Sequence, residues 1–125
     1  MFVELYRNDG KFVVCYNESA YLLHNIFDYK LVREGKKDKL GFPWTVLDNV
    51  IKKLTELKIN YQIYYKKELE SFKDFANVNN YEKYLEDGLL RLEIDKKIDL
   101  IQYKLKRMSL KDINGKLEEI MAIIK

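Results

Sequence analysis

The sequence has little of the side-chain chemistry that most catalytic and metal sites need. It contains a single cysteine, Cys15, and a single histidine, His24. One cysteine cannot form an intramolecular disulfide, which excludes a disulfide-stapled scaffold. These two residues also fall short of the tetrahedral set of nitrogen and sulfur ligands that a structural zinc site requires. We therefore expect Cys15 to be a small buried hydrophobe in a strand and His24 to be an ordinary helix residue.

Other functional patterns are missing as well. No G-x-x-x-x-G-K segment is present, which argues against nucleotide hydrolysis by that route. Acidic residues lie mostly near lysines, as Glu93 does near Lys96 and Lys97, which is typical of solvated ion pairs. No apolar run approaches the ~20 residues that span a bilayer, and the N-terminus lacks the basic leader and apolar run of a signal peptide. We expect a cytoplasmic protein that is not an enzyme, needs no cofactor or metal and does not bind membranes.

What the sequence does have is an uneven distribution of charge. The 125 residues carry a formal net charge of only +3. Residues 1–67 hold 12 Lys and Arg against 8 Asp and Glu, whereas residues 68–125 hold 11 against 12. Any surface that binds anions is therefore expected in the first half of the chain.

The first half reads as alternating strands and helices. Residues 2–6 and 12–16 are aromatic and β-branched runs separated by Asp9-Gly10, a strong hairpin signal. Apolar spacing predicts helices over 18–28, capped by Asn17, and 45–57, with Thr45 and Asp48 as a capping box. Further strands are expected at 29–33 and 59–65, and the charged segment 34–40 is expected to be a loop. The predicted order is ββαβαβ.

The second half reads as helical. Leu69, Phe72 and Phe75 suggest a short helix, Asp87-Gly88 could interrupt a following one, and Ser109 with Asp112 could cap the last. Two apolar seams favour an antiparallel helical hairpin or a coiled-coil contact. We therefore predict an α+β fold with a core domain at 1–66 and a helical extension at 67–125. The seam residues expected at an interface are Ile94, Ile98, Ile101, Leu105, Leu117, Ile120 and Ile124.

Two segments carry a family resemblance. The first is Tyr6-Arg7 followed by Gly10 to Ala20 (GKFVVCYNESA), and the second is Gly41-Phe42-Pro43-Trp44 before an amphipathic helix and a strand. In order and spacing, residues 1–66 resemble the N-terminal mismatch-recognition domain of MutS mismatch-repair proteins. The resemblance implies a mixed sheet packed by two helices and a role in DNA binding. In that family the Phe of a Phe-x-Glu motif wedges into the duplex and the Glu hydrogen-bonds to the mispaired base.

Phe12 matches the wedging Phe of that motif, but its neighbours differ from the family pattern. Val14 stands at the position of the Glu and offers no hydrogen bond, while Lys11 replaces an Asp and favours phosphate contact. The resemblance thus implies binding to double-stranded DNA without mismatch-specific readout, with affinity that falls steeply with salt. The expected DNA-binding residues are Arg7, Lys11, Phe12, Lys36, Lys37 and Lys39.

A second function remains open on the same sequence. A tyrosine-rich chain with apolar C-terminal seams also suits a protein-interaction or regulatory module that does not bind DNA itself. Such a module could self-associate through its C-terminal helices, or could modulate a host nucleic-acid enzyme as small phage and mobile-element proteins do. The orientation of Phe12 separates the two functions, because an exposed ring beside lysines favours nucleic acid.

Overall fold

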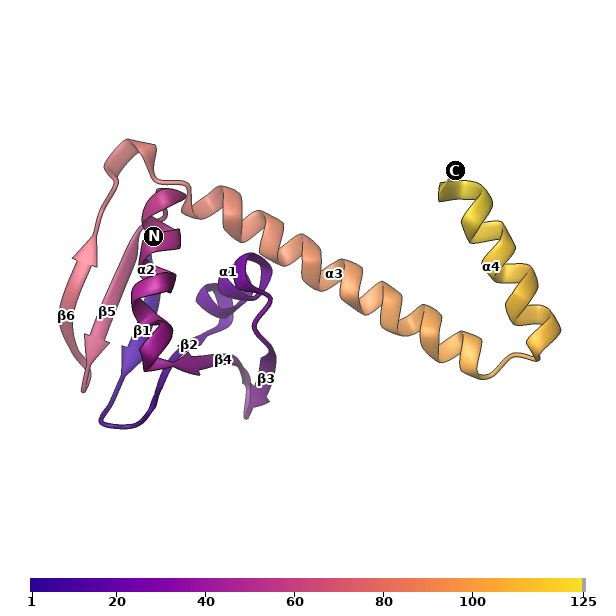
Figure 1. The fold of residues 1–125 in the computed structure, drawn as a ribbon, viewed down its shortest axis with the longest axis horizontal. Helices are drawn as coiled ribbons and strands as arrows, with labels where there is room; N and C mark the ends of the chain where they lie inside the picture. Colours follow the sequence, from indigo (N-terminus) through magenta and orange to yellow (C-terminus); the bar gives the residue numbers. More distant parts are fainter. Residues whose placement is uncertain (125) are drawn as a thin grey trace. The chain divides into compact units, whose positions relative to one another are not determined.

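The chain forms a six-stranded mixed sheet with helices, which confirms the predicted α+β class (Figure 1). The computed structural model describes residues 1–124. Residues 1–92 make one compact unit, and the described residues from Glu93 onward make a second. The strands are β1 (Val3–Arg7), β2 (Phe12–Tyr16), β3 (Leu31–Glu34), β4 (Lys37–Pro43), β5 (Tyr61–Tyr65) and β6 (Glu68–Lys73). Their order across the sheet is β3-β4-β2-β1-β5-β6; only β1 and β5 pair in parallel.

Helices form at both positions that apolar periodicity predicted in the first half of the chain, and two helices follow in the second half. They are α1 (Asn17–Phe27), α2 (Leu47–Glu56), α3 (Tyr81–Lys106) and α4 (Leu110–Ile124), with 3₁₀ turns at Trp44–Val46 and Ala76–Val78. Among the described residues, none of the helices combines the length and the apolar character needed to cross a bilayer. The pairing of the α3 and α4 seams into a hairpin stays a prediction.

The hydrophobic core lies between one face of the sheet and the helices of the first unit. Alternate strand residues are buried there because successive side chains in a strand point to opposite faces. The strands contribute Val3, Leu5, Val13, Cys15, Leu40, Phe42 and Ile63 to this core, and the helices contribute Ala20, Leu22, Leu23, Val50, Leu54, Tyr81 and Leu85. The other face of the sheet therefore presents the remaining strand residues.

The two segments singled out in the sequence are neighbours in the sheet. Phe12 at the start of β2 is the register partner of Pro43 at the end of β4, and Cys15 is the partner of Leu40. The Trp44 backbone N–H donates to the Lys11 carbonyl at 2.9 Å, which extends the pairing beyond the strands. The hairpin of β1 and β2 is antiparallel as expected.

The expectation of a loop at residues 34–40 was wrong. β3 and β4 form a tight hairpin in which Glu34 pairs with Lys37, and β4 continues to Pro43. Gly35 has a φ of +61°, a conformation that glycine adopts without steric cost. The sequence did not predict β4, because only Leu40 and Phe42 of this strand are buried and the charged residues around them are typical of a loop.

The short helix expected around Leu69 and Phe72 was also wrong, because Glu68–Lys73 is strand β6. A spacing of three residues between apolar positions is typical of a helix rather than a strand. Here a β-bulge shifts the register, so that Leu69 lies opposite Tyr64 while Phe72 lies opposite Gln62. The extra residue in the bulge brings Leu69 and Phe72 to the same face of the sheet despite their odd spacing.

Of the three helix caps that the sequence predicted, one is confirmed and two are wrong. Ser109 Oγ accepts from the Asp112 backbone N–H at 3.3 Å and its hydroxyl donates to the Asp112 carboxylate, which confirms the predicted cap of α4. Asn17 does not cap α1; its Oδ1 instead accepts the backbone N–H of Asp38 at 3.1 Å. Thr45 does not cap α2, because a 3₁₀ turn precedes that helix and no side chain caps it.

The sequence suggested that Gly88 could interrupt a helix, but α3 is continuous through it. The missing side chain of Gly88 allows α3 to approach α1 closely. A Cβ built at Gly88 would lie 2.7 Å from the Tyr21 carbonyl oxygen. Nearby, the Arg91 guanidinium donates to the His24 carbonyl at 2.9 Å and pairs with the Asp28 carboxylate. The first part of α3 is therefore held against α1 by backbone contact and by an arginine anchor.

Gly88→Ala is expected to destabilise the first unit. Overpacking costs about 1–3 kcal/mol, which outweighs the gain of up to about 1 kcal/mol in helix propensity. The measurement is the urea midpoint, with Gly115→Ala in α4 as the matched control, because a Cβ at Gly115 meets nothing within 4 Å. A Gly88→Ala protein as stable as the parent would show that α3 does not pack this tightly.

Candidate functional site on the open face of the sheet

One face of the sheet carries no helix within residues 1–92, and we call it the open face. Every residue on it is exposed or half-buried, whereas the other face carries the buried core residues of β1, β2, β4 and β5. Strand alternation and register assign to it Glu4, Tyr6, Phe12, Val14, Tyr16, Val32, Glu34, Lys37, Lys39, Gly41, Pro43, Gln62, Tyr64, Leu69 and Phe72. An aromatic-rich, uncovered sheet face of this kind is a candidate binding surface.

Phe12 projects into solvent from the beginning of β2. Its side chain is 58% exposed, while the next residue, Val13, is fully buried. An exposed ring forgoes most of the hydrophobic stabilisation that burial would give, so covering it with a partner would be favourable. Lys11 directly precedes it and is exposed. The structure therefore places an uncovered aromatic ring next to a cation.

Beside Phe12 lies a hollow of about 440 Å³ that we call the Gly41 hollow. Gly41 sits in the middle of it, opposite Val14, and its lack of a side chain leaves the space open. The lining residues are Phe12, Val14, Tyr29, Lys30, Val32, Lys39 and Gly41. Lys39 also faces Glu34, with Nζ 3.6 Å from the carboxylate oxygen. Because exposed ion pairs of this kind are weak, Lys39 can exchange that partner for another anion.

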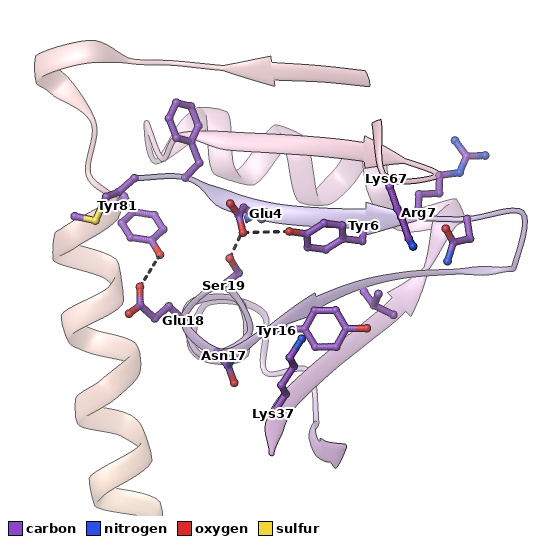
Figure 2. A pocket seen from close by; sticks show the side chains of 14 residues that line it. Glu4, Tyr6, Arg7, Tyr16, Asn17, Glu18, Ser19, Lys37, Lys67 and Tyr81 are labelled. Atoms are coloured by element: carbon purple, nitrogen blue, oxygen red, sulfur yellow. Dashed lines mark hydrogen bonds between the residues drawn. The ribbon is translucent and has the colours of Figure 1, made fainter. Parts of the chain in front are cut away.

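A larger hollow of about 770 Å³ lies along β1 and β2, and we call it the tyrosine hollow (Figure 2). Tyr6, Val14 and Tyr16 from the open face line it. The rings of Tyr6 and Tyr16 lie 6.1 Å apart and tilted by 52°, and Tyr6 also stacks on Tyr64 at 5.0 Å. The Lys37 ammonium lies 5.3 Å from the centre of the Tyr16 ring, close enough for a cation–π contact.

Carboxylates gather at the side of the tyrosine hollow near α3. The Tyr6 hydroxyl donates to Glu4 at 3.2 Å, and the Tyr81 hydroxyl donates to Glu18 at 3.4 Å (Figure 2). Burial raises the pKa of Tyr6 to about 12, with Glu4 adding to the shift. Burial likewise raises the pKa of Tyr81 to about 12, and both Glu18 and Glu4 contribute. Both phenols therefore remain neutral donors at physiological pH, in a region of negative potential.

Of the residues that the sequence grouped as a DNA-binding set, the structure brings Phe12 and Lys39 into one hollow and distributes the others along the sheet. Phe12, Lys37 and Lys39 belong to the open face, Lys11 precedes β2, and Lys36 is exposed in the turn between β3 and β4. Arg7 lines the tyrosine hollow together with Lys37 but belongs to the other face of the sheet. Arg7 follows Leu5 by two residues in β1, so it lies on the helix-covered face with Leu5. Its guanidinium lies 5.4 Å from the centre of the Trp44 ring and 5.8 Å from that of the Tyr65 ring. Figure 2 shows the Arg7 side chain directed away from Tyr16 and Lys37.

Several residues of these hollows were not singled out from the sequence. Tyr6 and Tyr16 could have been found, because they alternate with buried residues in a predicted hairpin. Lys30 and Val32 line the Gly41 hollow only because β3 pairs with β4, a strand that the sequence did not predict. Lys67 reaches the tyrosine hollow from the turn between β5 and β6, where Lys66 and Lys67 both have positive φ. That pair lacks the asparagine and glycine that usually signal such a turn.

The apolar seams of the second unit are open to solvent. Of the expected interface residues, Leu105 is half-buried. The others are exposed: Ile94, Ile98, Ile101, Leu117, Ile120 and Ile124. Leu110 and Ile123 are also exposed, at 86% and 83%. Exposed apolar area on this scale is typical of surfaces that contact a partner.

The lone cysteine and histidine have structural roles. Cys15 is fully buried, and burial raises the pKa of its thiol to about 12. The His24 Nδ1 lies 2.5 Å from the Tyr29 carbonyl oxygen, so the imidazole bridges the end of α1 and the approach to β3. The described residues contain no cluster of three or more His, Cys, Asp or Glu side chains that could hold a metal ion.

Comparison with models of known protein families gives no match for this sequence, and comparison with curated proteins gives none either.

Proposed function

We propose that this chain is a non-catalytic DNA-binding protein whose contact surface is the Phe12 end of the open face together with the β3–β4 hairpin. The observation that carries the proposal is the solvent-exposed Phe12 ring, which shares a hollow with Lys30 and Lys39. Lys11 precedes it, and Lys39 and Lys30 line the hollow beside it. Lys36 and Lys37 lie at the opposite end of β4, in and next to the β3–β4 turn. Lysines that contact phosphates position a nucleic acid, and an exposed aromatic ring can stack on or wedge between its bases.

The same geometry supports binding without mismatch-specific readout. Val14 lies two residues after Phe12 on the same face and has no polar group to offer a base. The proposed kinship with the MutS domain places a hydrogen-bonding Glu at that position, so its loss removes the specific contact while leaving the ring. The pairing of β2 with β4 also brings the two resembling segments together. The proposed affinity is thus mainly electrostatic and stacking in origin.

Lys37→Gln combined with Lys39→Gln is expected to make DNA binding less dependent on salt. Each lost phosphate contact reduces the slope of log K against log salt by about 0.9, so the double variant should flatten it by about two. Fluorescence anisotropy on a labelled duplex, from about 50 to 200 mM salt, measures this slope. The matched control is Lys52→Gln with Lys53→Gln, two exposed lysines on α2.

Two results would overturn the proposal. One is the absence of any measurable affinity for plain or mismatched duplex at low salt. The other is an equal loss in the α2 control, which would show that net charge rather than this surface drives binding. A clear preference for mismatched over plain duplex would contradict the absence of specific readout.

A second candidate function is protein interaction through the C-terminal helices, which the exposed seam residues of α3 and α4 favour. The buried centres of protein interfaces are more apolar than the rest of the protein surface and are depleted of charged residues. This function is compatible with the first, because the seams belong to residues from Glu93 onward and the open face to residues 1–92. If the DNA titration fails, protein interaction becomes the function that the geometry supports.

A further inference from the structure

The tyrosine hollow has two chemically different ends. Glu4 and Glu18 line it on the side of Tyr81, while Lys37 lies beside Tyr16 and Lys67 lies beyond Tyr6 (Figure 2). Between the two ends are the Tyr6 and Tyr16 side chains, both half-buried. A ligand that fits must therefore carry hydrogen-bond donors at one end, an anion at the other and a flat apolar body between them.

The hollow is also large enough for a small organic group. Its volume of about 770 Å³ falls in the range of about 300–1,000 Å³ that is typical of small-molecule sites. Tyrosine rings on an uncovered sheet are a common platform for unstacked bases. Lys37 already lies against the Tyr16 ring, where it can contact a phosphate attached to a base that stacks there.

We propose that the tyrosine hollow binds one unpaired nucleotide of a nucleic-acid strand, with the base against Tyr16, its amino edge toward Glu4 and Glu18, and its phosphate toward Lys37 and Lys67. This inference rests on the proposed function and names the form of nucleic acid that the surface takes. The base must be unpaired and unstacked, because stacking on Tyr16 needs a free ring face, which neighbouring bases occupy in a duplex. A carboxylate accepts from the exocyclic amino group of cytosine, adenine or guanine.

The division of charge separates this ligand from a purely cationic one. A lysine or arginine side chain of a partner protein would suit Glu4 and Glu18 but would meet Lys37 and Lys67 at the other end. A nucleotide meets a complementary group at both ends. Thymine and uracil lack an exocyclic amino group and present carbonyl oxygens to the carboxylates, so they should bind more weakly.

The test is anisotropy with short single-stranded oligo(dC) and oligo(dT) at fixed salt. The parent protein should bind oligo(dC) about tenfold more tightly than oligo(dT). Glu4→Gln with Glu18→Gln should remove that difference. Tyr16→Leu should weaken oligo(dC) binding about tenfold, while Tyr16→Phe should retain it because the ring remains. Circular dichroism checks that each variant is folded, and the Tyr16→Phe protein controls for changes in packing.

The possible failures point to different conclusions. If duplex is bound and Phe12→Ala weakens it, but oligo(dC) and oligo(dT) bind alike and Tyr16→Leu has no effect, the nucleotide site is overturned and the proposed function stands. If neither duplex nor oligonucleotide binds, both are overturned. If oligonucleotides fail and an oligo-lysine peptide binds through Glu4 and Glu18, the hollow recognises a protein cation instead.

Discussion

Phe12→Ala is expected to weaken DNA binding by about 5- to 150-fold, because base–aromatic stacking contributes about 1–3 kcal/mol for each ring. The folded state should lose little, since the ring is 58% exposed and surface substitutions usually change stability by less than about 0.5 kcal/mol. Fluorescence anisotropy at low salt measures the affinity, and urea unfolding of the same samples measures the stability. The two effects should therefore separate.

The control for this prediction is Phe72→Ala on β6. Phe72 is 59% exposed, which is almost the same as Phe12, and it belongs to the same open face. It lies on the opposite edge strand of the sheet from β3 and does not line the Gly41 hollow. An equal loss of affinity in both variants would assign the effect to exposed apolar area in general, and an unchanged affinity in Phe12→Ala would remove Phe12 from the site.

Phe42→Ala is expected to have the largest effect on stability, a loss of about 3–5 kcal/mol in the free energy of unfolding. Phe42 is the register partner of Val13, is only 1% exposed and stacks on Tyr29 with ring centres 5.7 Å apart. Removing the ring forfeits its burial and leaves a cavity that the sheet and α1 can only partly fill. The loss is a large share of the about 5–15 kcal/mol that stabilises a typical domain.

Urea unfolding followed by circular dichroism measures the effect of Phe42→Ala, and Phe12→Ala is its matched control. Both substitutions remove a phenyl ring from neighbouring strands, but one ring is in the core and the other is in solvent. A loss below about 1 kcal/mol for Phe42→Ala would mean that β4 does not pack as described, because buried Phe truncations rarely cost so little.

Local signals in the sequence were sufficient for much of the fold. Asp9-Gly10 between two aromatic and β-branched runs indicated the β1–β2 hairpin, and the spacing of Ala20 and Leu23 indicated α1. Ser109 and Asp112 marked the start of α4. Each of these features depends on residues within a few positions of one another, so the sequence carries the whole signal.

The strands β4 and β6 could not be predicted in the same way. Lys37–Pro43 is mostly charged and forms a strand because β2 and β3 supply hydrogen-bonding partners on both sides. Glu68–Lys73 carries its apolar residues at a helical spacing, and only the bulge opposite Ile63 and Tyr64 reconciles them with a strand. In both cases the pairing strand, and not the local sequence, decided the structure.

The candidate site divides along similar lines. The sequence grouped Phe12 with Arg7 and the lysines but left open whether its ring faces solvent or the core. The structure shows the ring 58% exposed and places Arg7 on the helix-covered face. The tyrosine hollow was not expected. It needs β1, β2, the start of α1, Tyr81 of α3 and the β5–β6 turn to meet, and these parts are far apart in the chain.

By itself, the sequence determined that the chain has one cysteine and one histidine, where charge is concentrated and which short segments favour helix or hairpin, because composition and near-neighbour spacing set these properties. Only the tertiary structure decided which strand residues face the core and which face solvent. It also decided the burial of Asn60, which is 4% exposed and whose backbone N–H donates to Asn79 Oδ1 at 2.9 Å. The physical reason is that burial and hydrogen-bond partners come from segments distant in the chain, and strand pairing fixes which segments those are.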